Sequence, residues 1–219
     1  SGDDVFQVLD GYVSGDTDFG AGASTFELDS ATYVGDITFG SDVQATISNS
    51  ELGGDLYFGS ASGSISILDD STVGGNFYSI GGLLDLTIDG SDVGFAEDTS
   101  MALANLTVSG GSVLSFEIDP NNLRTTPFFT ISGTTSLSDD VSIKPVLTSL
   151  IADDFTVPLI SGLNLDFSGE YDTITDDLPW IYDVSLTTSG TMTTELNLDF
   201  HLKSASELNL DSNQSSAYA

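Results

Sequence analysis

The feature that most constrains the fold of this chain is a repeat of about 20 residues. A glycine followed by Asp or Asn recurs at Gly15, Gly35, Gly54 and Gly75, so successive copies are 20, 19 and 21 residues apart. A second short strand motif returns in the same phase, at residues 25–29, 45–49, 66–70 and 86–90. Short alternating strands with a glycine turn after each are the signature of a β-solenoid, in which each coil buries its apolar face against the next.

The repeat also predicts which side chains form the core. The inward positions of the second motif form one aliphatic column: Leu28, Ile47, Leu68 and Ile88. Phe39 and Phe58 begin an aromatic column. The glycines should lie where the chain needs a positive φ or where backbones approach closely. An antiparallel sandwich or barrel also has short strands and turns, but it gives no reason for one motif to return in phase.

Glycine and proline divide the chain into three parts. Nineteen of the 23 glycines precede residue 112, whereas all five prolines lie between Pro120 and Pro179. We therefore expect repetitive coils over residues 1–110, a less regular C-terminal cap over 111–203, and a polar linker over 204–219. The prolines should lie at strand ends or in loops, because a central strand needs the N–H that proline lacks.

The charge excludes several classes of partner. The 219 residues include 34 Asp and Glu but only 3 Lys and Arg, which gives a formal net charge of −31. Arg124, Lys144 and Lys203 are too few to bind nucleic acid, where each phosphate contact needs a cation, and anionic lipid would repel the chain. The absence of cysteine excludes disulfides, thiolate metal sites and thiol catalysis. Hydrophobic residues, at 39%, are numerous enough to build a core.

The acidic residues offer poor candidates for catalysis. Adjacent pairs such as Asp69-Asp70 point to opposite faces of a strand, so they do not form an acid–base dyad and are expected in solvated turns. No EF-hand spacing or glycine–aspartate nonapeptide occurs. The densest cluster, Asp89 and Asp92 with Glu97 and Asp98, supplies the weak calcium candidates Asp89, Asp92 and Asp98. We expect no other cofactor and no catalytic residue.

Two further groups have a functional and a structural interpretation. His201 lies in an alternating strand without a second histidine, so an outward position is expected rather than a metal or triad role. The aromatic residues near the C-terminus either bind carbohydrate or close the end of the solenoid, and the second interpretation is favoured: Phe155, Phe167, Trp180 and Tyr182.

The order of motifs after residue 110 resembles the C-terminal passenger region of bacterial autotransporters, the type V secreted proteins. The motifs that carry the resemblance are a Gly-initiated strand at 110–119, a strand–Gly–Thr–strand unit at 130–137, a Phe-Thr-Val-Pro-Leu-Ile-Ser-Gly strand at 155–162, Leu-Pro-Trp-Ile at 178–181, and Leu-Asn-Leu-Asp-Ser-Asn-Gln-Ser-Ser-Ala at 208–217. The last is similar to the segment that precedes the translocator barrel of that family. The strong acidity and the lack of a barrel depart from the pattern.

The resemblance implies a right-handed parallel β-helix that ends in an autochaperone or junction region. It further implies a cell-surface or secreted location, outside the bacterial outer membrane, and the translocator barrel of the same precursor as a partner. No basic segment followed by an apolar run opens the chain, so a signal peptide has been removed or the chain is a segment of a longer one.

Together these observations predict a non-catalytic extracellular passenger segment that serves as a surface stalk or adhesin scaffold and as a folding template. A host-surface or polysaccharide ligand would be its external partner. Two alternatives remain open at this point: the stem of a β-helical enzyme that degrades polysaccharide, and a secreted filament subunit that self-associates by stacking end to end.

Overall fold

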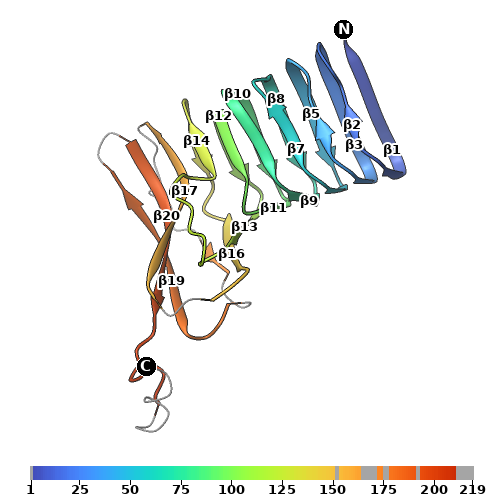
Figure 1. The fold of residues 1–219 in the computed structure, drawn as a ribbon. Coiled ribbons are helices and arrows are strands. Elements are labelled where there is room, and N and C mark those ends of the chain that lie inside the picture. The colour runs from blue at the N-terminus through green and yellow to red at the C-terminus, as the bar shows by residue number, and fades with distance from the viewer. Residues whose placement is uncertain (1, 151–152, 164–171, 175–177, 191–192, 211–219) are drawn as a thin grey trace.

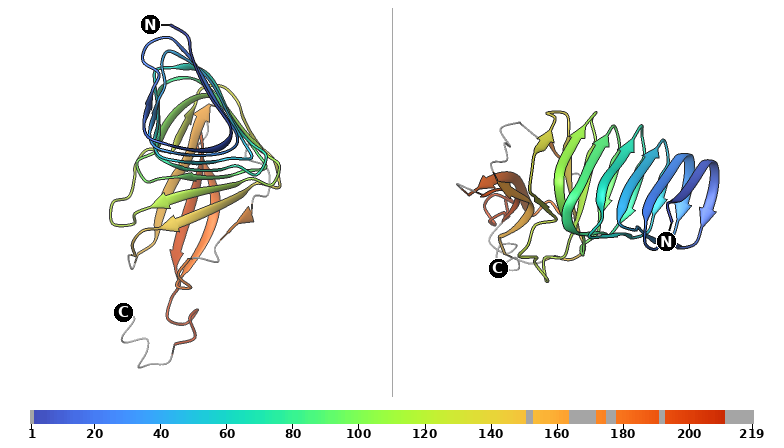
Figure 2. Two further views of the ribbon diagram at one scale, coloured as in Figure 1. Left: turned by 90° about the vertical axis from the view of Figure 1, so that its right-hand side faces the viewer. Right: turned by 90° about the horizontal axis from the view of Figure 1, so that it is seen from above.

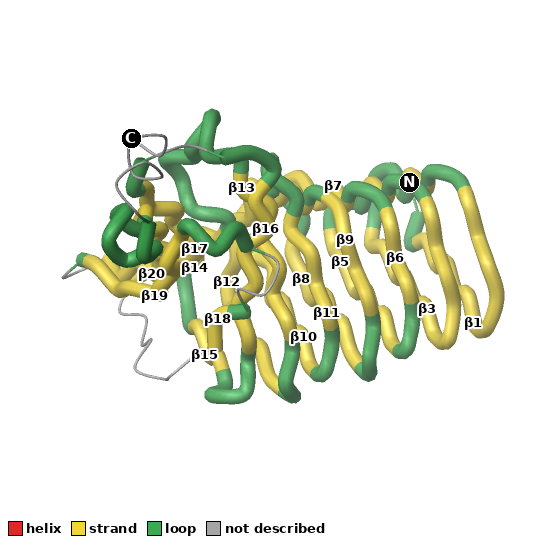
Figure 3. Tube along the Cα trace, turned by 90° about the horizontal axis from the view of Figure 1, so that it is seen from below, coloured by secondary structure: helices red, strands yellow, loops and turns green. Residues whose placement is uncertain are grey.

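The computed structural model describes residues 2–150, 153–163, 172–174, 178–190 and 193–210. All regular elements in these ranges are strands, joined by short turns and loops (Figure 3). Within them, no helix is long and apolar enough to span a membrane. The strands stack in parallel as a β-solenoid of about six turns, so the predicted parallel β-helix is confirmed (Figure 1).

Viewed along its axis, the solenoid has a three-sided outline (Figure 2), and we call its sides faces A, B and C. The longest strands bend around a corner and contribute to two faces: β1 (Asp4–Ser14) and β3 (Ala23–Val34) to A and then B, and β10 (Phe77–Asp89) and β12 (Ser100–Ser109) to C and then A. The remaining strands of face A are β5 (Asp42–Ser48), β8 (Ser62–Leu68) and β15 (Thr135–Leu137). Those of face B are β6 (Glu51–Gly53), β9 (Thr72–Gly75), β11 (Asp92–Phe95), β13 (Val113–Ile118), β16 (Ser142–Leu147) and β18 (Asp172–Thr173). Those of face C are β2 (Thr17–Asp18), β4 (Ile37–Thr38), β7 (Leu56–Gly59), β14 (Phe129–Ile131) and β17 (Phe155–Leu163).

The aliphatic column of face A exists, with one correction. The paired residues run Val8, Leu28, Ile47, Ile67, Ile88, Val108 and Leu137. Ile67, and not Leu68, therefore continues the column from Ile47. The corner that follows carries two residues with positive φ, Asp69 and Asp70. The equivalent corner of the preceding coil has only one such residue, Asn49, so this corner is one residue longer. Residues counted back from the corner are therefore displaced by one position, and the sequence spacing selected Leu68 in place of Ile67.

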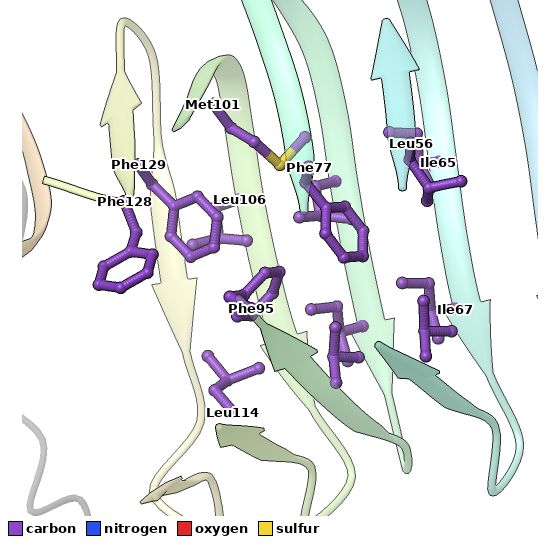
Figure 4. Packing of buried hydrophobic residues seen from close by; sticks show 14 of the residues in the cluster. Leu56, Ile65, Ile67, Phe77, Phe95, Met101, Leu106, Leu114, Phe128 and Phe129 are labelled. Atoms are coloured by element: carbon purple, nitrogen blue, oxygen red, sulfur yellow. The ribbon is translucent and has the colours of Figure 1, made fainter. Parts of the chain in front are cut away.

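The aromatic column is confirmed and starts one coil earlier than predicted. Phe19, Phe39 and Phe58 stack with ring centroids 5.5 and 4.8 Å apart. Further along the axis Phe77, Phe95 and Phe129 continue an aromatic core among aliphatic side chains that project inward from all three faces (Figure 4). Each coil thus buries large side chains only because its neighbours cover them, as expected for a solenoid.

The glycines of the repeat occupy the corner between faces B and C. Gly54 has φ of +138°, and a Cβ there would lie 2.0 Å from the carbonyl oxygen of Gly35 in the preceding coil. Both reasons given for the repeated glycine, backbone conformation and close approach, therefore apply at this corner. The coils can stack at this short distance only because glycine has no Cβ to hold the two backbones apart.

The coil length changes after β13. Paired residues are 19 to 22 positions apart up to that strand, as in Asp92 with Val113, and 28 to 31 apart beyond it, as in Val113 with Ser142. Between faces B and C, the added residues form the loop 119–128, and further residues lie between the end of β16 and the start of β17. Two prolines contradict the prediction, because Pro145 lies within β16 and Pro158 within β17. Pro145 is tolerated since β18 pairs only with Ser142 and Ile143, and Pro158 adjoins a register shift.

The solenoid ends in an antiparallel layer. β17 pairs in parallel with β14 on one side and antiparallel with β20 (Thr193–Leu202) on the other, and β19 (Tyr182–Ser189) pairs antiparallel with β20. Phe155, Tyr182 and Phe200 form a buried aromatic cluster there. The change of strand direction closes the C-terminal end of the core.

The first coil of the described residues leaves one edge of the solenoid uncovered. Among the described strands β1 pairs only with β3, so its outer edge carries unpaired backbone groups. Phe6 and Val8 are only partly buried, whereas Phe26 and Leu28 at the same positions of the next coil are fully buried. Among the described strands β19 also has a single partner, but it pairs antiparallel with β20. The two ends therefore differ in the direction of their outermost strand pairing and in core exposure.

Candidate functional site

A column of buried serines joins the coils at the corner between faces A and B. The hydroxyl oxygens of Ser50, Ser71, Ser91 and Ser112 each accept a backbone N–H from the preceding coil, at 3.0 to 3.3 Å. Each hydroxyl also donates to a carbonyl of its own coil, as Ser71 does to Leu68 at 2.6 Å. The serines thus satisfy amides that would otherwise be buried without a partner.

A second polar column follows the corner between faces B and C. The Oδ1 atoms of Asp16, Asp36 and Asp55 accept backbone N–H groups of the next coil at 2.8 to 3.0 Å, and Asn76 Oδ1 accepts from Asp98. Here the acceptor belongs to the earlier coil, so the two columns run in opposite directions along the axis. The Asp of the Gly-Asp repeat is therefore a structural residue of the coil interface.

The calcium candidates are not gathered around one point. Asp89 Oδ1 accepts a hydrogen bond from Ser109 at 2.7 Å, at the end of β10. Asp92 begins β11, and Asp98 lies beyond its other end, so face B separates them. Within the described ranges no group of three or more His, Asp or Glu side chains is placed to hold a metal ion. The geometry gives a calcium ion no shared set of ligands at these residues.

The adjacent acids lie where their turns require them. Asp69 and Asp70 both have positive φ at the corner that follows β8. Asp140 accepts from Ser138 within the turn before β16, and Asp154 binds the end of β20. The pair at 176–177 lies outside the described residues. All described Asp and Glu are at least partly exposed.

Arg124 holds the first long loop against the solenoid. Its guanidinium donates to the carbonyls of Glu97, Thr99, Thr126 and Pro127 at 2.7 to 3.1 Å and lies 3.5 Å from the centroid of the Phe128 ring. Burial lowers the pKa of Arg124 to about 10, so the group stays charged at neutral pH. A polysaccharide lyase needs a cationic side chain toward an acidic sugar, and the Arg124 guanidinium is here engaged with backbone oxygens.

His201 points outward, as predicted, and contacts one acid. Its Nδ1 lies 3.1 Å from Asp154 Oδ2, and Asp154 Oδ1 accepts the N–H of Leu202 at 2.7 Å. These hydrogen bonds lower the pKa of Asp154, with the backbone bond as the larger cause. The contact ties the segment before β17 to the end of β20, which fastens the antiparallel layer.

The C-terminal aromatic residues separate into two kinds. Phe155 and Tyr182 belong to the buried cluster that closes the core, with centroids 5.8 Å apart. Trp180, only two residues from Tyr182, is 65% exposed. Phe167 lies outside the described residues. The core-closing interpretation is thus confirmed for Phe155 and Tyr182 and wrong for Trp180.

The beginning of the predicted linker forms a single capped turn. Ser204 and Glu207 bond reciprocally, since the Ser204 N–H donates to Glu207 Oε2 at 2.6 Å and the Glu207 N–H donates to Ser204 Oγ at 3.4 Å. This arrangement is a capping box, which normally starts a helix. Asn209 then adopts φ of +54°, and the turn ends. Residues 211–219, where we predict an extended or mobile tail, lie outside the described residues.

Sequence reasoning missed the serine column and the arginine contacts. The serines recur at spacings of 21, 20 and 21, in phase with the glycines, and this periodicity could have identified them.

Comparison of the chain with protein-family models, with curated proteins and with solved structures found no match. The functional argument therefore rests on the chain's own geometry.

Proposed function

We propose that this chain is a non-catalytic, extracellular β-helical stem of an autotransporter passenger, and that its C-terminal end serves as the folding template. The observation that carries the proposal is the contrast between the two ends. The C-terminal end is closed by the antiparallel strands β19 and β20, whereas β1 leaves an edge on which a parallel coil can stack. Parallel coils can therefore continue the solenoid at β1 but not at the antiparallel layer, where the aromatic cluster also covers the core.

The resemblance of the motifs after residue 110 to an autotransporter passenger supports a role for the difference between the two ends during secretion. In a passenger that leaves the cell C-terminus first, the closed end emerges first and offers its last coil to the chain that follows. The translocator barrel of the same precursor is then the partner, the bacterial cell surface the location, and an adhesin or stalk the role.

The asymmetry also favours the stem over the filament alternative. End-to-end stacking needs two ends that continue each other's register. The parallel edge at β1 and the antiparallel layer at β19 do not. The enzyme alternative gains no support from Arg124, whose donors are occupied by backbone carbonyls.

Pulsed hydrogen exchange during refolding of the full chain tests the template role. We expect the amides of β13, β14, β17 and β20 to gain protection before those of β3 and β5. Protection that appears first in β3 and β5, or simultaneously in all coils, would contradict the proposal. Surface display of the chain fused between a signal peptide and a translocator barrel tests the location, with protease accessibility of intact cells as the measurement.

A further inference from the structure

The exposed tryptophan lies in a groove beside the antiparallel layer. The groove has a volume of about 420 Å³, and its lining includes Pro179, Trp180, Tyr182, Asp183 and Lys203. It combines an aromatic surface with one acidic and one basic side chain. It adjoins the core cluster, because Tyr182 belongs to both, whereas Phe155 does not line the groove.

The position of Trp180 is fixed although its side chain is exposed. Its carbonyl accepts a hydrogen bond from Lys203 Nζ at 3.1 Å, and the Tyr182 N–H donates to the Pro179 carbonyl at 3.1 Å, which closes the turn around it. Lys203 Nζ also lies 2.9 Å from Asp183 Oδ1. The backbone is therefore held while the indole extends into solvent, so a ligand would not have to order the site.

This combination matches the chemistry of a sugar ring. One face of a pyranose is lined with C–H groups that pack against an aromatic ring, while its hydroxyls need both donors and acceptors. Trp180 offers the apolar surface and an indole N–H donor, and Asp183 offers a carboxylate acceptor. The net charge of −31 disfavours an acidic sugar.

We propose that this groove binds a neutral saccharide, with Trp180 stacked on a sugar ring and the Asp183 carboxylate hydrogen-bonded to its hydroxyls. Lys203 holds Asp183 and the backbone of Trp180 in place. The inference is independent of the stem role, because the groove belongs to this chain whether or not the chain is exported. It would give the C-terminal end of the solenoid a recognition function.

The composition provides a direct measurement, since Trp180 is the only tryptophan in the chain. We expect its fluorescence to change saturably during titration with neutral gluco-, manno- or chito-oligosaccharides, with a dissociation constant on the order of 1 mM. Polygalacturonate, an acidic polymer, should produce no saturable change. A response confined to the acidic polymer, or no response to any neutral oligosaccharide at millimolar concentration, would overturn the proposal.

Variants assign the binding to the groove. By calorimetry we expect Trp180→Ala to weaken binding at least about tenfold, the usual cost of removing a central aromatic anchor. Asp183→Asn should weaken binding while leaving the aromatic surface intact, and it serves if Trp180→Ala fails to fold. Tyr78→Ala, an aromatic truncation on face C, is the matched control and should bind normally. Unchanged affinity in folded Trp180→Ala would contradict the proposal.

Discussion

The regular coils over residues 4–118 and the C-terminal region over 119–203 both contain parallel strands, but different contacts hold them together. In the coils the same kinds of contact recur from one coil to the next, as in the serine column and the stacked Phe19, Phe39 and Phe58. In the C-terminal region the contacts are single, as at Arg124 and Asp154. A repeated contact stabilises two neighbours at once, whereas a single contact fixes one loop. The region that ends the solenoid therefore depends on a few individual side chains.

The largest expected effect comes from removing the antiparallel layer. Truncation after residue 150 deletes β17 to β20, so β14 keeps its pairing with β12 but loses its partner on the other edge, and its core side chains are exposed. We therefore expect loss of the cooperative thermal transition and aggregation. Circular dichroism melting and light scattering measure this. Deletion of residues 204–219 alone is the control and should leave the midpoint unchanged. A cooperative melt at unchanged midpoint after the larger truncation would refute the capping role.

Within the coils, neighbouring glycines provide a matched pair. Gly54→Ala introduces a Cβ into contact with the Gly35 carbonyl at a positive φ, so we expect a loss of about 3 kcal/mol in the free energy of unfolding. Gly53→Ala meets no atom within 4 Å and should change it by less than about 1 kcal/mol. Denaturant melts compare the two. Equal effects would mean that the corner does not depend on backbone contact.

The corresponding test of the C-terminal region is Arg124. Arg124→Ala leaves carbonyls without their donor, and we expect a loss of about 2 to 3 kcal/mol. Arg124→Lys should recover little, because one ammonium cannot reproduce the planar set of donors. Hydrogen exchange should show the increased mobility confined to residues 97–99 and 119–128. If exchange rose equally in β3 and β5, the contacts would not be local.

A smaller effect is expected from one serine of the repeated column. Ser71→Ala removes the acceptor of the buried Ser50 N–H, which should cost about 1 to 2 kcal/mol. Ser66→Ala, on the outer side of face A, is the control and should stay within about 0.5 kcal/mol of the parent. A neutral Ser71→Ala would mean that water or another group satisfies that amide.

The smallest effect concerns the charge that both regions share. Salt should raise the melting temperature by a few degrees between about 0.01 and 1 M NaCl, because screening weakens repulsion among the carboxylates. Calcium and magnesium should act equally if they only screen. A calcium-selective rise that Asp89→Asn, Asp92→Asn or Asp98→Asn abolished would instead establish a specific site. A flat melting temperature across this range would show that the acids are spaced too widely to repel.

The sequence predicted the repeated part of the molecule better than the rest. Period, strand phase and glycine corners follow from backbone geometry, which requires the same residue type in every coil. Leu68 was misassigned because the repeat spacing already varies between 19 and 21 residues, so it does not show that one corner contains an extra left-handed residue. The antiparallel strands β19 and β20 could not be predicted, since alternation is the same for either strand direction.

The candidate site was predictable only as a set of residues. The four C-terminal aromatic residues were identified together, but burial assigns Tyr182 to the core and Trp180 to solvent although only two positions separate them. The carbonyl of Trp180 is bound by Lys203, which lies 23 positions away in the sequence, and no local sequence pattern indicates this contact.

The opposite directions of the serine and aspartate columns bear on how such a chain changes length during evolution. The coil with Ser50 and Asp55 gives one side-chain acceptor to the coil before it and one to the coil after it, and the coil with Ser71 and Asn76 does the same, so neighbouring coils of this kind are joined in the same way. Joining Gly35 to Asp55 removes residues 36–54 and brings Asp16 opposite Asp55 with both columns intact. A deletion of half a coil would misalign both columns at once. Recombination can therefore shorten or lengthen this protein in steps of one coil, about 4.8 Å each.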